Sequence, residues 1–178
     1  MNKIVNLIKQ DPIRVEALSQ VYKLNLPQCY IAAGFVRNVV WDAIHSYKTP
    51  TVLNDVDVIY FDPTESSSQA FLEYESLLKA RMPTLNWQVR NQAKMHERNG
   101  DKPYQSTIDA MRYWPEKETA VAIRQLQSNK YECVAAFGFD SLLKGCITFN
   151  PQRSQDVFLQ RVTSKGWLKT WPNLDIVL

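Results

Sequence analysis

The sequence predicts an α+β fold in which a mixed sheet carries its helices mainly on one face. Helix-period and strand-period segments are interspersed, and they follow no regular strand–helix–strand alternation. Apolar residues make up 45% of the 178 residues, which is enough for one core. We therefore expect a single domain over residues 1–178, with a core over about 25–150 and a C-terminal tail over 151–178 packed on it.

The first half of the chain contains clear helix and strand signals. Asp11 is a preferred N-cap residue and Pro12 is tolerated at the first helical position, so a helix is expected to begin there. The predicted helices cover 3–10, 12–24, 35–45 and 69–81, and the predicted strands cover 29–33, 53–62 and 85–89. The buried stripes expected for the last two helices are Val36, Val39, Val40, Ala43 and Ile44, and Phe71, Leu72, Leu77 and Leu78.

The second half begins with a polar segment, 91–105, in which Gly100 and Pro103 indicate a functional loop or a short helix and loop. Two strands, 119–123 and 131–137, are expected to form a hairpin. Further helices are predicted over 106–114, 140–144 and 154–165, with a short strand over 147–149. Trp167 and Trp171 are expected to pack the tail back on the body.

Composition excludes several classes of protein. No apolar run approaches the roughly 20 residues that a membrane-spanning helix needs, and the N-terminus lacks a signal-peptide core. Three widely spaced cysteines without a Cys-x-x-Cys motif argue against a disulfide framework or a zinc site. We therefore expect a cytoplasmic protein. A net charge of +3 is compatible with an anionic ligand.

Asp55 and Asp57 stand two residues apart in an apolar run of strand-forming residues. Side chains alternate along a strand, so both carboxylates face the same side. Two neighbouring carboxylates need a counter-charge, and Mg²⁺ or Mn²⁺ commonly supplies it together with phosphate ligands. The alternative is that these acids cap a turn at the strand end. Their face continues into the core with Ile59 and Phe61, which favours the metal site.

Gly34 stands between a predicted strand and a predicted helix. The N–H groups at such a helix start can bind an anion, and Arg37 in the first turn can bind phosphate oxygens. The alternative is a tight turn that needs glycine only for steric reasons.

These two features together resemble the nucleotidyltransferase superfamily that includes polymerase beta and the tRNA nucleotidyltransferases. The tRNA enzymes carry a Gly-Gly-x-Val-Arg-Asp turn, which this sequence matches at Gly34, Val36 and Arg37. Ala33 replaces the first glycine and Asn38 replaces the aspartate. The segment between the turn and the carboxylates is also longer here.

A closer resemblance is to a family of bacterial nucleotidyltransferase-like proteins, and it covers roughly residues 30–150. The similar segments are Ala33 to Asp42, Asp55 to Asp62, Trp87 to His96, Asn99-Gly100, Pro103-Tyr104 and Thr119 to Arg124. The family is named by its fold, so the resemblance indicates a fold and leaves the reaction open.

The resemblance implies a division of roles within the site. Gly34, Arg37 and Asn38 would bind the phosphates of a nucleoside triphosphate, and Asp55 and Asp57 would bind Mg²⁺ or Mn²⁺. A third carboxylate on a neighbouring strand would bind a second ion and activate an acceptor hydroxyl. Asn91 stands near that place but is an amide. Asp109 is the other candidate, although Ser106 to Asp109 has the spacing of a capping box.

A basic stripe follows the predicted strand over 85–89. Its cations are spaced by four residues: Arg90, Lys94, Arg98 and Lys102. We expect Arg90, Asn91, Lys94 and His96 to line the site and bind substrate. The alternative is a solvated helix face, since Glu97 and Asp101 dilute the charge.

Three functions follow from these observations. The first is an Mg²⁺-dependent nucleotidyltransferase that moves a nucleoside monophosphate from an NTP to an unknown hydroxyl acceptor, which is a small molecule, an RNA or a protein. The second is a non-catalytic module that binds nucleotide and metal through a degenerate site. The third, RNA binding, is the weakest, because no aromatic and basic RNA-binding motif is present. The sequence predicts no membrane partner and does not define an oligomeric state.

Overall fold

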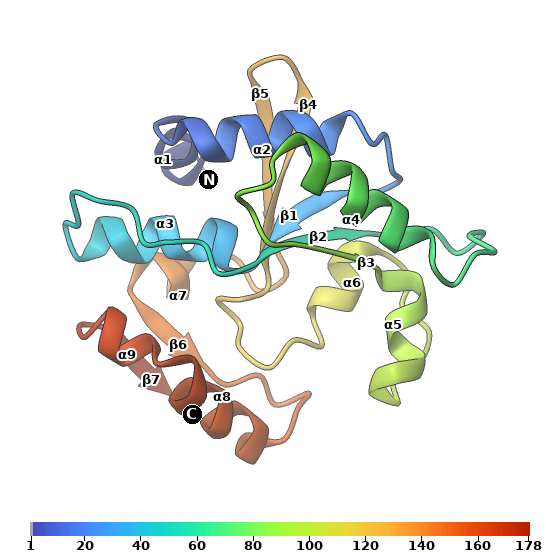
Figure 1. Cartoon of the computed structure of the whole chain (residues 1–178). Helices are drawn as coiled ribbons and strands as arrows, with labels where there is room; N and C mark the ends of the chain where they lie inside the picture. Colours follow the sequence, from blue (N-terminus) through green and yellow to red (C-terminus); the bar gives the residue numbers. More distant parts are fainter. Residues whose placement is uncertain (1) are drawn as a thin grey trace.

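A five-stranded sheet forms the centre of the computed structural model, which describes residues 2–178 (Figure 1). Its strands are β1 (Tyr30–Ala32), β2 (Val56–Tyr60), β3 (Trp87–Asn91), β4 (Val121–Gln127) and β5 (Lys130–Ala135). Their spatial order is β3-β2-β1-β4-β5, with β2 and β3 parallel and the other pairs antiparallel. The hairpin of β4 and β5 confirms the predicted one. A separate parallel pair joins β6 (Cys146–Thr148) and β7 (Asp175–Val177).

Helices connect and cover these strands. They are α1 (Asn2–Lys9), α2 (Pro12–Tyr22), α3 (Gly34–Ile44), α4 (Ala70–Arg81), α5 (Gln92–Asn99), α6 (Thr107–Met111), α7 (Asp140–Leu143), α8 (Gln155–Lys165) and α9 (Trp167–Thr170). Asp11 caps α2 as predicted, accepting from the N–H groups of Ile13 and Arg14. Among residues 2–178, no helix has the length and apolar character needed to cross a bilayer.

One face of the sheet carries the main hydrophobic core. Ile31, Val58 and Val89 are fully buried there, on three neighbouring strands. Helices α1, α2 and α4 pack against this face and lie above the sheet in Figure 1, and the start of α3, to the left of the sheet in that view, contributes to the same core. The predicted α+β class, with helices mainly on one face, is therefore confirmed.

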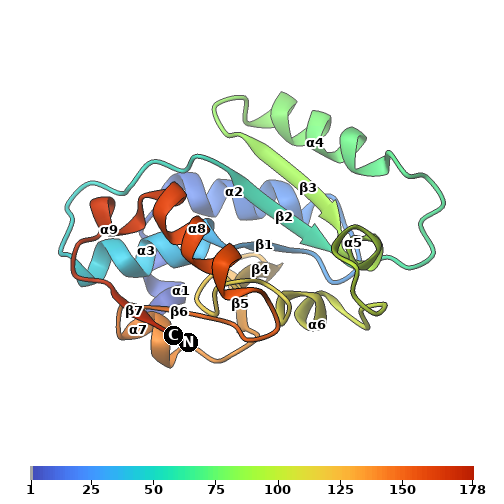
Figure 2. The ribbon, with the colours of Figure 1, turned by 90° about the horizontal axis from the view of Figure 1, so that it is seen from below.

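The opposite face is only partly covered. A smaller cluster that includes Tyr30, Ile59 and Met111 joins the sheet to α6. Viewed from below, α8 lies in front of the start of α3, whereas β2 and β3 are open along most of their length and only their ends lie behind α5 (Figure 2). Asp57 and Ile59 belong to this face, because Val56, Val58 and Tyr60 belong to the main core.

The C-terminal tail packs on α3, as the sequence predicted. Trp167 and Trp171 are buried and contact Trp41 edge-on, with ring centroids 5.9 and 5.1 Å apart. The Trp171 indole N–H donates to Asp42 at 2.8 Å, and Asp42 also accepts from the Thr51 N–H at 2.8 Å. One aspartate on α3 therefore fixes both the tail and the segment that leads to β2.

Two predicted helix stripes differ from the structure. In α3, Ala43 and Ile44 are exposed, because the core contacts lie in the first turns and the helix end projects beyond the sheet. In α4, Leu72 and Leu77 are exposed, since the helix contacts the core through Phe71, Tyr74 and Leu78. The elements α9 and β7 are missing from the prediction, because each spans only a few residues and forms by docking on the body. The division into core and tail stays a prediction.

Candidate functional site

The open face of the sheet carries a cleft with two connected parts. We call them the α3 lobe and the β3 lobe. The α3 lobe has a volume of about 170 Å³, and its lining includes Gly34, Arg37, Asn38, Asp55, Asp57, Arg161, Lys165 and Trp167. The β3 lobe has a volume of about 500 Å³, and its lining includes Asp57, Gln88, Arg90, Gln92, Asn99, Tyr113, Trp114 and Arg153. Ala33, Asp57, Thr119 and Arg161 line both lobes, so the lobes meet at Asp57.

The start of α3 presents a backbone donor to the α3 lobe. The N–H groups of Val36 and Arg37 donate to the Ala33 carbonyl at 3.1 and 2.9 Å. Gly34 lines the lobe, and its N–H finds no acceptor among residues 2–178, so this group can donate to an anion. Helix α3 spans 11 residues, and its dipole adds to that preference.

The conformational strain of this turn lies at Ala33 and not at Gly34. Ala33 has φ 55° and ψ −124°, a region that favours glycine, and its N–H is held by the Val121 carbonyl at 2.9 Å. A methyl group at Gly34 would meet Arg37 and Asn38 only at ordinary contact distances of 3.5 Å. Steric need therefore does not explain Gly34. The position where the related turn carries its first glycine is the strained one.

Arg37 is a buried cation held between two aromatic rings. Its guanidinium lies 4.7 Å from the Trp41 ring centroid and 4.6 Å from that of Trp167. It donates to Thr119 Oγ1 at 2.8 Å, while its Nε is buried without a partner among the described residues. Burial lowers the pKa of Arg37 to about 10, so it stays charged at neutral pH. Asn38, which is also buried, accepts from Arg37 Nη2 at 3.1 Å.

Helix α8 adds two cations that the sequence analysis did not identify. Arg161 pairs with the fully buried Glu116, with Nε and Oε1 2.6 Å apart. Lys165 lies one helical turn later and forms no ion pair within residues 2–178. Arg161 and Lys165 are four residues apart and precede Trp167 in the sequence. That spacing places both side chains on one helix face, and it was the sequence signal that could have identified them.

Asp55 and Asp57 supply the acidic side of the α3 lobe. Asp55 comes directly before β2 and accepts from Asn86 Nδ2 at 2.6 Å. Asp57 lies on β2, and burial raises its pKa, with a further contribution from the neighbouring Asp55 charge. Arg37 and Lys165 act in the opposite direction. Both carboxylates therefore line one cleft beside cations and a free N–H donor.

The residue beside Asp57 on the next strand is an amide. In the parallel pairing of β2 and β3, Asp57 is in register with Gln88 and Ile59 with Arg90. In-register neighbours lie on the same face, so Gln88 occupies the place where a neighbouring strand would present a third carboxylate. The Gln88 side chain forms no hydrogen bond among residues 2–178, and it lines the β3 lobe.

Asn91 and Asp109, the two candidates for a third acid, lie elsewhere. Asn91 caps α5 through the Ala93 N–H, and its amide donates to the Asp62 carbonyl at 2.8 Å and to Glu65 at 3.0 Å. Asp109 belongs to a capping box at the start of α6, where its N–H donates to Ser106 Oγ at 3.0 Å. Neither residue belongs to the lining of the two lobes.

The predicted basic stripe divides between two regions. Arg90 lines the β3 lobe but pairs with Glu75, with Nη1 and Oε1 2.6 Å apart. Lys94 lines a separate pocket beside Glu65 and Ser67. His96 places Nδ1 2.9 Å from the Ala93 carbonyl and its ring against Tyr104, outside the lining of both lobes. Of these three residues, only Arg90 shares the lining of the β3 lobe with Asp57.

The donor set fits one hard divalent cation. Mg²⁺ is typically bound by one or two carboxylates, with water and substrate phosphates completing its coordination. Asp55 and Asp57 match that set. Burial, followed by the neighbouring Asp55 charge, raises the pKa of Asp57, and a bound cation would offset both. Among residues 2–178 no group of three or more His, Cys, Asp or Glu side chains could enclose a metal. The residues thus fit an ion held jointly with phosphate and do not form an all-protein cage.

Comparisons with known proteins identify the family and agree with the fold. A family model described as "Nucleotidyltransferase" matches residues 19–176. A solved structure whose title states that it "reveals a CCA-adding enzyme head domain" aligns with a TM-score of 0.85 and 27% identity over 99% of this chain and 95% of that one. No curated protein matches. The family match extends through the tail that carries Arg161 and Lys165, and it shows that this chain belongs to the nucleotidyltransferase family.

Proposed function

We propose that this chain transfers a nucleoside monophosphate from an NTP to a hydroxyl acceptor in an Mg²⁺-dependent reaction. The observation that carries this proposal is the meeting of Asp55 and Asp57 with the start of α3, Arg37 and Lys165 in one lobe. Carboxylates that hold a cation stand beside groups that hold phosphate oxygens. That combination suits a polyphosphate that arrives with a divalent cation, because the cation offsets the repulsion between its phosphates and the carboxylates.

The residues have distinct proposed roles. The free N–H group of Gly34, together with Lys165, binds the β- and γ-phosphates. Asp55 and Asp57 hold Mg²⁺ or Mn²⁺, and the ion, when bound, neutralises charge on the α-phosphate and on the pyrophosphate. Arg37 lies deeper, where its contact with Trp167 also keeps the tail in place.

In the proposed transfer, an acceptor oxygen forms a bond to the α-phosphorus while the bond to the pyrophosphate oxygen breaks. Pyrophosphate leaves with that electron pair, and the hydroxyl proton passes to water. Gln88 cannot accept this proton, because an amide has no basic site of suitable strength. The chain's own contribution is therefore mainly positioning and charge stabilisation.

A second candidate is a module that binds a nucleotide and a metal without transfer. The observation that favours it is Gln88, since the in-register neighbour of Asp57 supplies no third carboxylate. This candidate uses the same binding residues and differs only in turnover.

Calorimetric titration with ATP, GTP, CTP and UTP, with and without Mg²⁺, tests the binding that both candidates share. Pyrophosphate release in the same mixtures, with small hydroxyl compounds, RNA and protein as acceptors, tests transfer. Release that disappears in Asp57→Asn supports transfer. Metal-dependent binding without release under any acceptor supports the module. Metal-dependent binding that survives in Asp55→Ala would contradict both.

A further inference from the structure

The β3 lobe differs chemically from the lobe that would hold phosphates. Its volume of about 500 Å³ lies within the range of about 300–1,000 Å³ that small-molecule pockets occupy. Its arginines are each paired with a carboxylate: Arg90 with Glu75, Arg153 with Asp101, and Arg161 with Glu116. A polyanion would therefore gain little electrostatic attraction in this lobe, because its cations are already paired. A neutral polar ligand does not depend on such attraction.

Two uncommitted amides line this lobe. Gln92 is 5% exposed, and its only side-chain hydrogen bond within residues 2–178 is a long one of 3.4 Å from Nε2 to the Arg90 carbonyl. The Gln88 side chain makes no hydrogen bond within residues 2–178. Each amide offers a donor and an acceptor side by side, which is the pattern that matches the edge of a nucleobase.

Aromatic side chains form another wall. Trp114 packs against the cluster that contains Tyr30 and Ile59, and it lines the lobe together with Tyr113. A base can stack on such a ring whatever its identity, because every base has a π-face.

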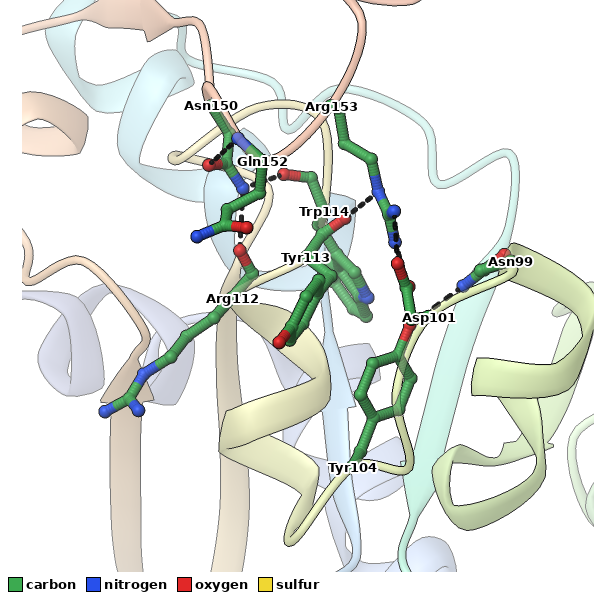
Figure 3. A network of polar contacts seen from close by, with 9 residues as sticks. All are labelled: Asn99, Asp101, Tyr104, Arg112, Tyr113, Trp114, Asn150, Gln152 and Arg153. Carbon is green, nitrogen blue, oxygen red and sulfur yellow. Dashed lines mark hydrogen bonds and ion pairs between the residues drawn. The ribbon is translucent and has the colours of Figure 1, made fainter.

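The segment that carries these rings is fixed in place, as Figure 3 shows. Asn150, which is fully buried, donates to the carbonyls of Arg112 and Trp114 at 2.7 Å each. Arg153 donates to the Tyr113 carbonyl and pairs with Asp101, which also accepts from Tyr104. The wall is thus held by its backbone. The Tyr113 ring already packs against Tyr104 and lies under Arg153, whereas Trp114 has no aromatic or cation–π partner among residues 2–178. A wall fixed in advance costs little ordering entropy when a ligand binds.

Position along the cleft supports the same assignment. An NTP has its α-phosphate between its nucleoside and its two outer phosphates. If the α-phosphate lies at Asp57, where the lobes meet, and the outer phosphates lie in the α3 lobe, the nucleoside extends into the β3 lobe. We propose that the β3 lobe is the nucleobase subsite, with Trp114 as its stacking surface and Gln88 and Gln92 as its hydrogen-bonding amides. This inference rests on the proposed nucleotide binding.

The test compares an NTP with inorganic tripolyphosphate, which has three phosphates and no nucleoside. Both are titrated calorimetrically, in Mg²⁺, into the wild type, Trp114→Ala, Trp114→Phe and Gln92→Met. We expect Trp114→Ala and Gln92→Met to weaken binding of the preferred NTP about tenfold and to leave the affinity for tripolyphosphate within about twofold. Trp114→Phe, which retains a ring, should restore most of the loss. Lys165→Ala is the matched control, because it should weaken both ligands equally.

Three outcomes would overturn the inference. If the wild type binds NTP and tripolyphosphate equally, or if the variants leave NTP affinity unchanged, the β3 lobe serves another ligand such as the acceptor, and the proposed function stands. If the wild type binds neither ligand, the proposed function fails as well. Thermal unfolding of each variant checks folding, and Gln92→Met together with Trp114→Phe keeps the test decisive if Trp114→Ala does not fold.

Discussion

The two lobes on either side of Asp57 differ in how their charges are balanced. In the α3 lobe, neither Arg37 nor Lys165 has a carboxylate partner within residues 2–178, and Asp57 has a raised pKa. In the β3 lobe every lining arginine is already paired. The α3 lobe therefore has unpaired charges that suit a charged ligand and its cation, whereas the charges of the β3 lobe already neutralise one another. The two lobes therefore suit ligand groups of different charge, although they meet at one carboxylate.

The largest expected effect comes from removing the charge of Asp57, which lines both lobes. Asp57→Asn keeps the shape of the side chain but removes the charge that both lobes share. We expect pyrophosphate release to fall about 100-fold or more, because several kcal/mol of charge stabilisation depend on the ion that the carboxylates hold. Steady-state release assays in Mg²⁺ and Mn²⁺ measure this effect. The exposed Asp140→Asn is the control, and unchanged release in Asp57→Asn would refute the role of the acid pair.

Adding a carboxylate at position 88 tests whether a missing third acid limits transfer. Gln88→Glu places an acid in register with Asp57, at the boundary of the β3 lobe. If a missing proton acceptor limits transfer, release should rise about 100-fold, the scale of general-base catalysis. Gln88→Met has a similar shape and cannot take a proton, so it serves as the control. A rate no higher than that of the wild type would mean that the third acid is not what limits this chain.

Removing Lys165 separates ligand binding from stability. We expect Lys165→Ala to weaken binding of an NTP about tenfold, because one charge-assisted hydrogen bond to phosphate is lost. The unfolding temperature should stay constant, since Lys165 is exposed and has no ion pair within residues 2–178. Titration and thermal unfolding measure the two effects. Lys169→Ala on α9 is the control, and equal binding by both variants would exclude Lys165 from the site.

The pH dependence of the ligand-free protein probes Asp57 directly. Its folded pKa is raised above 3.8, so between 3.8 and the raised value the folded state binds more protons than the unfolded state. Stability that Asp57 contributes is therefore complete below this window and falls as pH rises through it. At pH 7 without metal, Asp57→Asn should raise the unfolding temperature by about 2–4 °C. Mg²⁺ with NTP should stabilise only the wild type, and an unchanged unfolding temperature in the variant would contradict this account.

The smallest expected effect concerns the strained turn that both lobes share. Ala33→Gly should relieve the positive φ and raise the free energy of unfolding by about 0.5–1 kcal/mol, after allowance for the flexibility of glycine. Urea unfolding measures it, with Ala136→Gly in the hairpin region as a control that should destabilise. A loss of stability in Ala33→Gly would show that its methyl contacts outweigh the strain.

Much of the fold could be read from local sequence signals. The cap at Asp11, the helix after Gly34 and the hairpin over β4 and β5 all depend on residues close in sequence. The buried stripes of α3 and α4 were partly wrong, because which helix face is covered depends on the position of the sheet. Ile44 and Leu77 are apolar at helical spacing, yet nothing in the structure packs over them fully.

In the candidate site, too, some residues could be predicted from local sequence and others depend on packing. The placement of Gly34, Arg37 and Asp57 in one cleft was expected from motif spacing and resemblance, and the α3 lobe contains all three. The spacing of Arg161 and Lys165 indicates that they share one helix face, but it does not place that face at the cleft, because the tail reaches the cleft only through the docking of Trp167 and Trp171 on Trp41. Asn91 was considered for the third acid because it ends a strand, but side-chain alternation and register place Gln88 beside Asp57.

The α+β class, the family resemblance and the acid pair could all be recognised in the sequence, since each depends on short-range periodicity or on residues within one motif. The residues that complete the cleft became evident only from contacts across the fold. Strand register placed Gln88 next to Asp57, and tail packing placed Lys165 opposite the start of α3. The physical reason is that register and docking arise from contacts between residues distant in the chain, and no local pattern records them.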